Sequence, residues 1–114
     1  MVGDDCWLGE NCWIDNLDKV VIGSNVCISQ GALLLTGNHD YTIFSMPYRN
    51  APIKIEDGDW IGAKTTVCLG VTVQRNAILT VGSVATKDMK ENGMYQGNPA
   101  LKIRERKINK GINL

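Results

Sequence analysis

Aliphatic residues recur every six positions along most of the chain. The series runs through Val2, Leu8, Ile14, Ile22, Ile28, Leu34, Ile55, Ile61, Val67, Val73 and Leu79, and Ala85 closes it. A six-residue period fits neither an amphipathic helix, with its period of about 3.6, nor an alternating strand, with its period of about 2. A short strand followed by a corner does produce it. The repeat therefore predicts an all-β chain wound as a parallel β-helix of triangular coils.

The same period predicts which side chains form the core. Three hexapeptides make one coil, so the chain returns to the same face after about 18 residues, at the ordinary strand spacing of about 4.8 Å. A small residue often follows the aliphatic one, as Gly9 and Gly62 do, and we expect it to let the chain turn without a clash at the corner. About four coils result. The three expected inward ladders are Val2, Ile22, Ile55, Val73; Leu8, Ile28, Ile61, Leu79; and Ile14, Leu34, Val67, Ala85.

Two interruptions break the period. Two extra residues between Ile14 and Ile22 indicate a local bulge, whereas the insertion over about residues 36–53 is too long for one. Long loops in compact domains are usually functional. This one contains His39, the only histidine of the chain, within Asn38-His39-Asp40. The insertion is therefore the first candidate for a functional site.

The chain changes character over about residues 88–114. In the tail of this segment, over residues 102–110, five cations stand against one acid, Glu105; they are Lys102, Arg104, Arg106, Lys107 and Lys110. We expect this segment to cap the open end of the β-helix, with a short terminal helix. The 114 residues are then one domain with one inserted loop and one cap.

Composition excludes several classes of partner. Lysine plus arginine equals aspartate plus glutamate at 12 each, so no overall basic field favours nucleic acid or an anionic membrane surface. The longest apolar run, Ala32 to Leu35, is far short of the roughly 20 residues of a membrane span. The first residues lack the pattern of a signal peptide. We expect a soluble cytoplasmic protein.

The four cysteines do not form a metal motif. Cys6 and Cys12 are six residues apart, and Cys27 and Cys68 stand alone, so the C-x-x-C spacing of zinc sites is absent from the sequence. We expect reduced, partly buried thiols and no bound metal.

Motifs outside the repeat add a resemblance. They are Asn38-His39-Asp40, Asp59-Trp60-Ile61-Gly62, Gly70-Val71-Thr72-Val73, Thr86-Lys87-Asp88 and Gly97-Asn98-Pro99-Ala100. In this order, over roughly residues 2–104, the chain resembles the hexapeptide-repeat acyltransferases. Among them it is most similar to sugar O-acetyltransferases of the colanic acid and exopolysaccharide branch, and more distantly to maltose and galactoside acetyltransferases. The resemblance also implies a left-handed winding.

The resemblance implies a catalytic role for the insertion. In similar enzymes, the histidine that matches His39 is the general base that activates an acceptor hydroxyl for attack on the thioester of acetyl-CoA. Imidazole suits this role because its neutral form accepts a proton near pH 7. Asp40 either orients His39 by accepting its other ring proton or only forms a turn. Asn38 completes the motif. Trp60 either lines the pocket for the acceptor and the cofactor or is a packing residue.

The resemblance also implies a cofactor path and an assembly. Similar enzymes bind CoA in a groove between the subunits of a homotrimer, so Ala63, Val81, Thr86 and Lys87 are expected along the pantetheine and nucleotide, with Arg104 near a phosphate. Cations and backbone donors favour phosphate, which suits the basic tail. The alternative is a tail that is simply solvated.

The chain departs from the maltose and galactoside enzymes in two ways. It has Gly9 and Leu17 where they place an asparagine and an aspartate in the acceptor site, so Asn16 and Asp18 are the remaining candidates for contacts with a sugar or glycan. Relatives also usually carry further sequence before the first coil, so this is either a naturally short form or a part of the protein. A short start leaves the first coil with an uncovered backbone edge.

Three functions compete at this point. The first is acetyl-CoA-dependent O-acetyl transfer to a sugar or glycan. The second is a zinc hydratase like the γ-class carbonic anhydrases, which needs three histidine ligands where this chain has only His39. The third is a non-catalytic trimeric β-helix that acts as a scaffold or binding protein. We favour the acetyltransferase, because the motifs occur together and in order.

Overall fold

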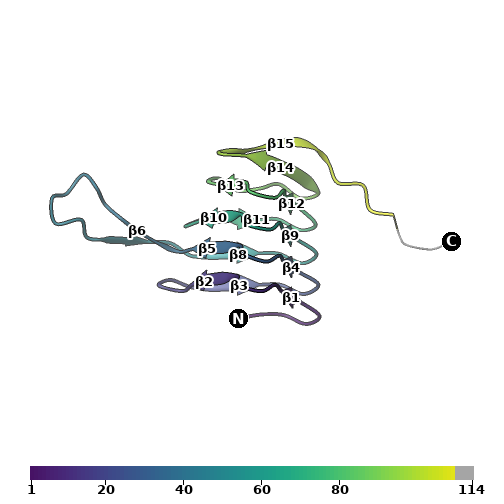
Figure 1. Ribbon diagram of the computed structural model, residues 1–114, viewed down its shortest axis with the longest axis horizontal. Helices are drawn as coiled ribbons and strands as arrows, with labels where there is room; N and C mark the ends of the chain where they lie inside the picture. Colours follow the sequence, from purple (N-terminus) through teal and green to yellow (C-terminus); the bar gives the residue numbers. More distant parts are fainter. Residues whose placement is uncertain (110–114) are drawn as a thin grey trace.

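The computed structural model describes residues 1–109, and these form fifteen short strands and no helix. The strands stack as successive coils around one core, and a hairpin extends from one side of the stack (Figure 1). The prediction of an all-β chain with parallel sheets is confirmed. Over the described residues, no helix has the length and apolar character needed to cross a membrane. The last five residues of the expected cap, with Lys110, lie outside the described part.

Three sheets form the faces of the coil. The first face has the order β1 (Trp7–Leu8), β4 (Cys27–Ile28), β9 (Trp60–Ile61), β12 (Ile78–Leu79), β14 (Gly93–Gly97) and β15 (Ala100–Glu105). The second face has the order β13 (Val84–Ala85), β10 (Thr66–Cys68), β5 (Leu33–Leu35) and β2 (Trp13–Asp15). The third face has the order β11 (Thr72–Val73), β8 (Ile53–Ile55) and β3 (Val20–Ile22). The hairpin consists of β6 (Gly37–His39) and β7 (Tyr48–Asn50).

The chain visits the faces in a fixed order, from first to second to third and then to the first again on the next coil. Neighbouring strands within a face are parallel, except for β14 and β15. The coil therefore has three edges, which we call the first–second, second–third and third–first edges. The hairpin leaves the coil between β5 and β8, at the second–third edge.

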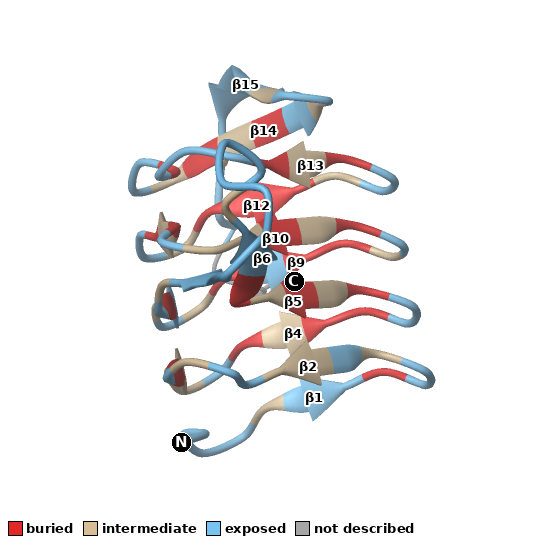
Figure 2. Ribbon diagram, turned by 90° about the vertical axis from the view of Figure 1, so that its left-hand side faces the viewer, coloured by how far each residue is buried: buried red, intermediate tan, exposed pale blue. Residues whose placement is uncertain are grey.

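The three predicted ladders exist in the predicted register. The central pairs are Ile22 with Ile55, Ile28 with Ile61, and Leu34 with Val67. All six side chains are buried, with at most 2% of their surface exposed. In Figure 2, buried residues, in red, recur along the strands of successive coils. Burying this apolar surface is the main favourable contribution to folding.

Two residues extend the core beyond the prediction. Met89 forms a bridge with Val73, and Tyr95 pairs with Leu79, so both lengthen existing ladders. Both side chains are buried. The sequence did not reveal them because neither residue belongs to the aliphatic set that defined the repeat.

The corners turn at positions other than those expected. A single residue with positive φ turns the chain on the first–second edge at Asn11, Gly31, Lys64 and Gly82, and on the third–first edge at Asp5, Asn25, Gly58, Asn76 and Asn92. The small residues after the aliphatic ones serve another purpose, since a Cβ on Gly62 would lie 2.5 Å from the carbonyl oxygen of Leu79. These residues are small because the next coil approaches closely, and the turn itself follows two residues later.

The expected terminal helix is wrong within the described residues. Strand β14 continues the first face, and β15 folds back antiparallel on it after a turn in which Gly97 has φ of 108°. Apolar and cationic side chains alternate from Leu101 to Arg104, which is the period of a strand. The cap is therefore a hairpin that adds a strand to the first face.

Candidate functional site

The neck of the β6–β7 hairpin is anchored in the coil. Thr36 is fully buried there, and its hydroxyl donates to the carbonyl of Asp15 and accepts the N–H of Asp18 at 3.2 Å. The N–H of Ala51 donates to the carbonyl of Thr36 at 3.0 Å, which closes the neck. A Cβ on Gly37 would lie 2.5 Å from Leu17 Cδ1. The hairpin therefore has a fixed base, although most of its own residues are exposed (Figure 2).

His39 is held from three sides at the end of β6. Its backbone N–H donates to Asn38 Oδ1 at 2.7 Å, and its ring stacks on Tyr48 with centroids 4.8 Å apart and planes at 28°. Ring atom Nδ1 lies 2.7 Å from the carbonyl oxygen of Met46. A carbonyl oxygen only accepts, so Nδ1 carries the proton. In the neutral ring, Nε2 then has a lone pair that no described residue occupies.

Asp40 shapes the turn and does not touch the histidine ring. Its Oδ1 accepts from the hydroxyl of Thr42 at 2.5 Å and from the N–H of Thr42 at 3.0 Å. These two bonds lower the pKa of the Asp40 carboxyl, with the hydroxyl bond as the larger cause. The carbonyl of Met46, and not Asp40, accepts the proton on Nδ1 of His39. Of the two alternatives for Asp40, the structure agrees with the turn-forming one.

A groove of about 480 Å³ opens at the first–second edge. Three predicted site residues, Trp60, Ala63 and Val81, line it. The lining is completed by Trp7, Ser29, Gln30, Gly62, Ile78, Leu79, Thr80 and Met94. The Nε1–H of Trp60 donates to Ser29 Oγ at 2.8 Å. The structure thus brings the expected wall residue and two expected cofactor contacts to one largely apolar groove.

The other expected cofactor residues are divided between two places. Arg104 pairs with Met94 across β14 and β15, so it lies next to a residue that lines the groove. Thr86 and Lys87 are exposed and follow β13 directly, which puts them on the second–third edge. That is the edge that carries the hairpin.

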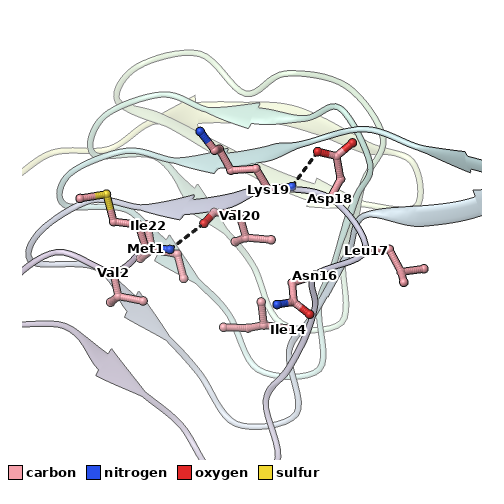
Figure 3. Close-up of a pocket in the computed structure, with 9 residues that line it drawn as sticks. All are labelled: Met1, Val2, Ile14, Asn16, Leu17, Asp18, Lys19, Val20 and Ile22. Atoms are coloured by element: carbon pink, nitrogen blue, oxygen red, sulfur yellow. Dashed lines mark hydrogen bonds between the residues drawn. The ribbon is translucent and has the colours of Figure 1, made fainter.

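Asn16 and Asp18 lie on the second–third edge of the lowest coil. They line a hollow of about 530 Å³, together with Met1, Val2, Ile14, Leu17, Lys19, Val20 and Ile22 (Figure 3). Asp18 Oδ1 accepts the N–H of Lys19 at 2.7 Å. Since the N–H of Asp18 also bonds Thr36, this hollow lies at the base of the hairpin.

Within one chain, His39 and the groove are on different edges. The hairpin leaves between the second and third faces, whereas Ala63 and Val81 lie between the first and second faces. In Figure 1 the hairpin extends to the left, and β9 and β12 are on the right of the stack. His39 and the groove therefore do not form one site in a single chain.

Sequence reasoning missed Trp7, Ser29 and Met94 in the groove. The signal for Trp7 was present, because Trp7 and Trp60 each stand immediately before a ladder residue of the same face. Trp7, Cys27 and Trp60 thus form one outward column by the hexapeptide count alone. Met94 required the unexpected strand β14. Among the described residues, no three histidine, cysteine, aspartate or glutamate side chains form a group able to hold a metal ion.

Comparison with known proteins places the chain among acetyltransferases. No protein-family model matches it. A protein of Escherichia coli strain K12 with the provisional name colanic acid biosynthesis acetyltransferase WcaF is 32% identical over 105 residues, which cover 92% of this chain and 58% of the relative. The chain thus spans little more than half the length of that relative.

Solved structures agree with this placement. The hexapeptide-repeat acetyltransferase VCA0836 of Vibrio cholerae has a TM-score of 0.88 at 27% identity, over 94% of this chain and 62% of its own. A maltose O-acetyltransferase of Clostridium difficile 630 has a TM-score of 0.76 at 26% identity, over 95% and 68%. VCA0836 has also been solved with acetyl coenzyme A. With its hexapeptide ladders, this chain is similar over nearly all of its length, in sequence and in fold, to the hexapeptide-repeat acetyltransferases.

Proposed function

We propose that this chain is an acetyl-CoA-dependent O-acetyltransferase that modifies a hydroxyl of a sugar or glycan, with His39 as the general base. The observation that carries the proposal is the state of the His39 ring. Nδ1 is bonded to the carbonyl of Met46, and Nε2 of the neutral ring keeps a lone pair that no described residue occupies. In this tautomer, Nε2 is the ring nitrogen that can take a proton from an acceptor hydroxyl.

The reaction that follows is direct transfer. Nε2 of His39 accepts the proton as the acceptor oxygen attacks the carbonyl carbon of the thioester. The tetrahedral intermediate collapses, the bond between carbon and sulfur breaks, and the CoA thiolate leaves. The imidazolium returns its proton to that thiolate, so free CoA and an acetyl ester are the products. No metal ion is required for this sequence.

The groove at the first–second edge is the proposed acetyl-CoA site. Its walls include Trp60, Ala63 and Val81, which offer apolar surface to the pantetheine arm. Arg104 is the cross-strand partner of Met94, which lines this groove, and supplies a cation for a phosphate. VCA0836, a relative with the same fold, was solved with acetyl coenzyme A.

A second chain is needed to complete the site, because His39 and the groove lie on different edges of one chain. We propose a homotrimer in which the second–third edge of one subunit, with His39, Thr86 and Lys87, faces the groove of the next. Closed rings of this kind repeat one heterologous contact. The winding that goes with this assembly is left-handed, with about four coils, and a monomer is inactive.

The acceptor binds near the base of the hairpin in this proposal. Asn16 and Asp18 lie there and offer amide and carboxylate groups for sugar hydroxyls. Two relatives are named for colanic acid biosynthesis and for maltose. A role in polysaccharide biosynthesis in the cytoplasm, where acetyl-CoA is available, fits these names.

The first test is release of free CoA by the purified protein. A panel of mono-, di- and oligosaccharides is offered with acetyl-CoA, and the thiol released is measured against a sample without acceptor. At least one acceptor should raise thiol release well above that background. If calorimetry detects no binding of acetyl-CoA and no acceptor raises thiol release, the chain is better described as a scaffold.

The second test asks whether two chains share one site. A His39→Ala chain lacks the base, and a Val81→Trp chain has its groove filled at a position that is 72% exposed and so tolerates the larger ring. Each alone should be inactive. After dissociation and reassembly of an equal mixture, about a quarter of the sites join an intact base to an open groove if each site spans two subunits of a ring. A mixture as inactive as its components would contradict the shared site.

A further inference from the structure

Trp60 carries one polar atom into the wall of an apolar groove. The side chain is 45% exposed, and its Nε1–H donates to Ser29 Oγ at 2.8 Å. Ser29 lies on the preceding coil and is only 6% exposed. Both residues line the groove. The buried hydroxyl of Ser29 therefore accepts a hydrogen bond from the only donor of the partly exposed Trp60 ring.

We propose that Ser29 is a positioning residue that fixes the indole of Trp60 as a wall of the groove and keeps the groove open for acetyl-CoA. This proposal rests on the proposed function, because the ligand of the groove is the one named there. Ser29 acts through Trp60 and takes no part in the bond changes.

Ser29 is itself rigidly held. Its N–H donates to the carbonyl of Ile61 at 2.8 Å, and its carbonyl accepts the N–H of Ala32 at 3.3 Å. Both neighbours are buried residues of the core. The hydroxyl thus has a fixed position relative to the strand that carries Trp60. Its hydrogen bond with Nε1 then holds the indole ring in one orientation.

The ring has little else to fix it. Its outward neighbours on the first face are Cys27 on the coil below and Ile78 on the coil above, and neither offers an acceptor comparable to a hydroxyl. Cys27 Sγ itself lies 3.9 Å from Ser29 Oγ, at the outer limit for a hydrogen bond with sulfur. Without the Ser29 hydroxyl, Nε1–H must turn toward water to find a partner, and the ring then swings across the groove mouth.

The test combines Ser29→Ala and Trp60→Phe, separately and together. In the free protein, Ser29→Ala should speed solvent exchange of the Trp60 indole proton at least about tenfold, because the proton loses its partner. The loss of one indole signal in Trp60→Phe identifies that proton among the three tryptophans. Trp13→Phe is the matched control, because Trp13 lies on the second face and outside the groove.

Binding of acetyl-CoA, measured by calorimetry without an acceptor, gives the second readout. Ser29→Ala should weaken it about three- to tenfold, the range expected for one hydrogen bond. The same change should have no added effect in the Trp60→Phe background, because phenylalanine has no donor to lose. In the intact enzyme the cost should appear in KM for acetyl-CoA rather than in kcat.

Two results would overturn the proposal. One is an unchanged exchange rate of the indole proton in Ser29→Ala. The other is an equal loss of affinity from Ser29→Ala in the parent protein and in the Trp60→Phe background, which would show that Ser29 acts independently of the ring. If the parent protein itself fails to bind acetyl-CoA, the proposed function is wrong, and the exchange rate alone then decides whether Ser29 holds the ring.

Discussion

The stacked coils and the β6–β7 hairpin are ordered in different ways. The coils bury continuous ladders of aliphatic side chains, and Ile28, Leu34 and Ile55 have no exposed surface. The hairpin buries almost nothing beyond its neck, and Phe44 at its end is fully exposed. Its order comes from strand pairing and a few local hydrogen bonds, such as that from His39 Nδ1 to the carbonyl of Met46.

This difference separates stability from activity. Because the ladders hold the fold and the hairpin holds the proposed base, a change in one region should leave the other function largely intact. Four variants test how complete this separation is.

The largest effect is expected from His39→Ala in the hairpin. Removing a general base lowers kcat by about a hundred- to ten-thousandfold. The free energy of unfolding should stay unchanged, since the side chain is exposed and its loss leaves no cavity. Steady-state kinetics and urea denaturation of the same preparation measure both quantities. Full activity in this variant would exclude His39 as the base.

Leu34→Ala should give the opposite result in the coils. Leu34 is fully buried between Ile14 and Val67 in the ladder of the second face. Truncation of a buried leucine destabilises a protein by about 2–5 kcal/mol, through lost apolar burial and the cavity left behind. Urea denaturation measures the loss, and Leu17→Ala, at a 56% exposed position, is the control. A loss below about 1 kcal/mol would mean that the ladder is not the dominant source of stability.

Asp59 should make the stability of the coils depend on pH. Burial raises the pKa of its carboxyl to about 8. Hydrogen bonds from the backbone N–H groups of Ala77 and Glu56 favour the carboxylate and oppose this rise only in part. Between the ordinary pKa of about 4 and this value, the folded chain keeps a proton that the unfolded chain has lost. Stability should therefore fall by a few kcal/mol as pH rises from about 5 to 8.

Urea denaturation at several pH values measures this slope. In Asp59→Asn the group no longer titrates, so the slope should shrink. Asp57→Asn is the matched control, because Asp57 lies on the same edge, is exposed, and also accepts a backbone N–H, from Ser24. A slope that persists in Asp59→Asn would assign the pH dependence to another group.

The smallest effect is expected from Asp40→Ala. Asp40 closes the turn through Thr42 and does not contact the His39 ring, so its loss should loosen the hairpin without removing the base. We expect kcat to fall about two- to fivefold from poorer placement of His39, with no change in unfolding midpoint. Thr42→Val removes only the hydroxyl bond and leaves the N–H of Thr42 bonded to Asp40, so its effect should be no larger. A loss as large as that of His39→Ala would indicate a direct chemical role for Asp40.

The two regions also differed in how far the sequence predicted them. The register of the ladders followed from the period of six, because three faces of six residues repeat in phase over each coil. The place of His39 followed from the interruption of that period. The contact between Nδ1 and Met46 did not, because it depends on a turn in which Met46 takes φ of 48°, and no local pattern announces that turn.

Other errors have equally physical causes. The expected turn positions lie two residues before the observed ones. The glycines after the aliphatic residues are there because neighbouring coils come close, whereas the residues that turn the chain are mostly asparagines and other glycines. The cap was expected to include a short terminal helix because the alternation from Leu101 to Arg104 is too short to indicate a strand by itself, and the pairing with β14 could not be seen in the sequence. The sequence did not decide whether Trp60 lines a pocket or only packs. The structure shows that Trp7 and Trp60 of the first face both line the groove.

The closed neck of the hairpin has a consequence for how such a chain can diverge. Thr36 and Ala51 are joined by a hydrogen bond across the neck, so the coil continues as though the residues between them were absent. The number and chemistry of those residues are then free to vary while every rung keeps its spacing. A hairpin of another length could therefore replace this segment without changing the stacked coils.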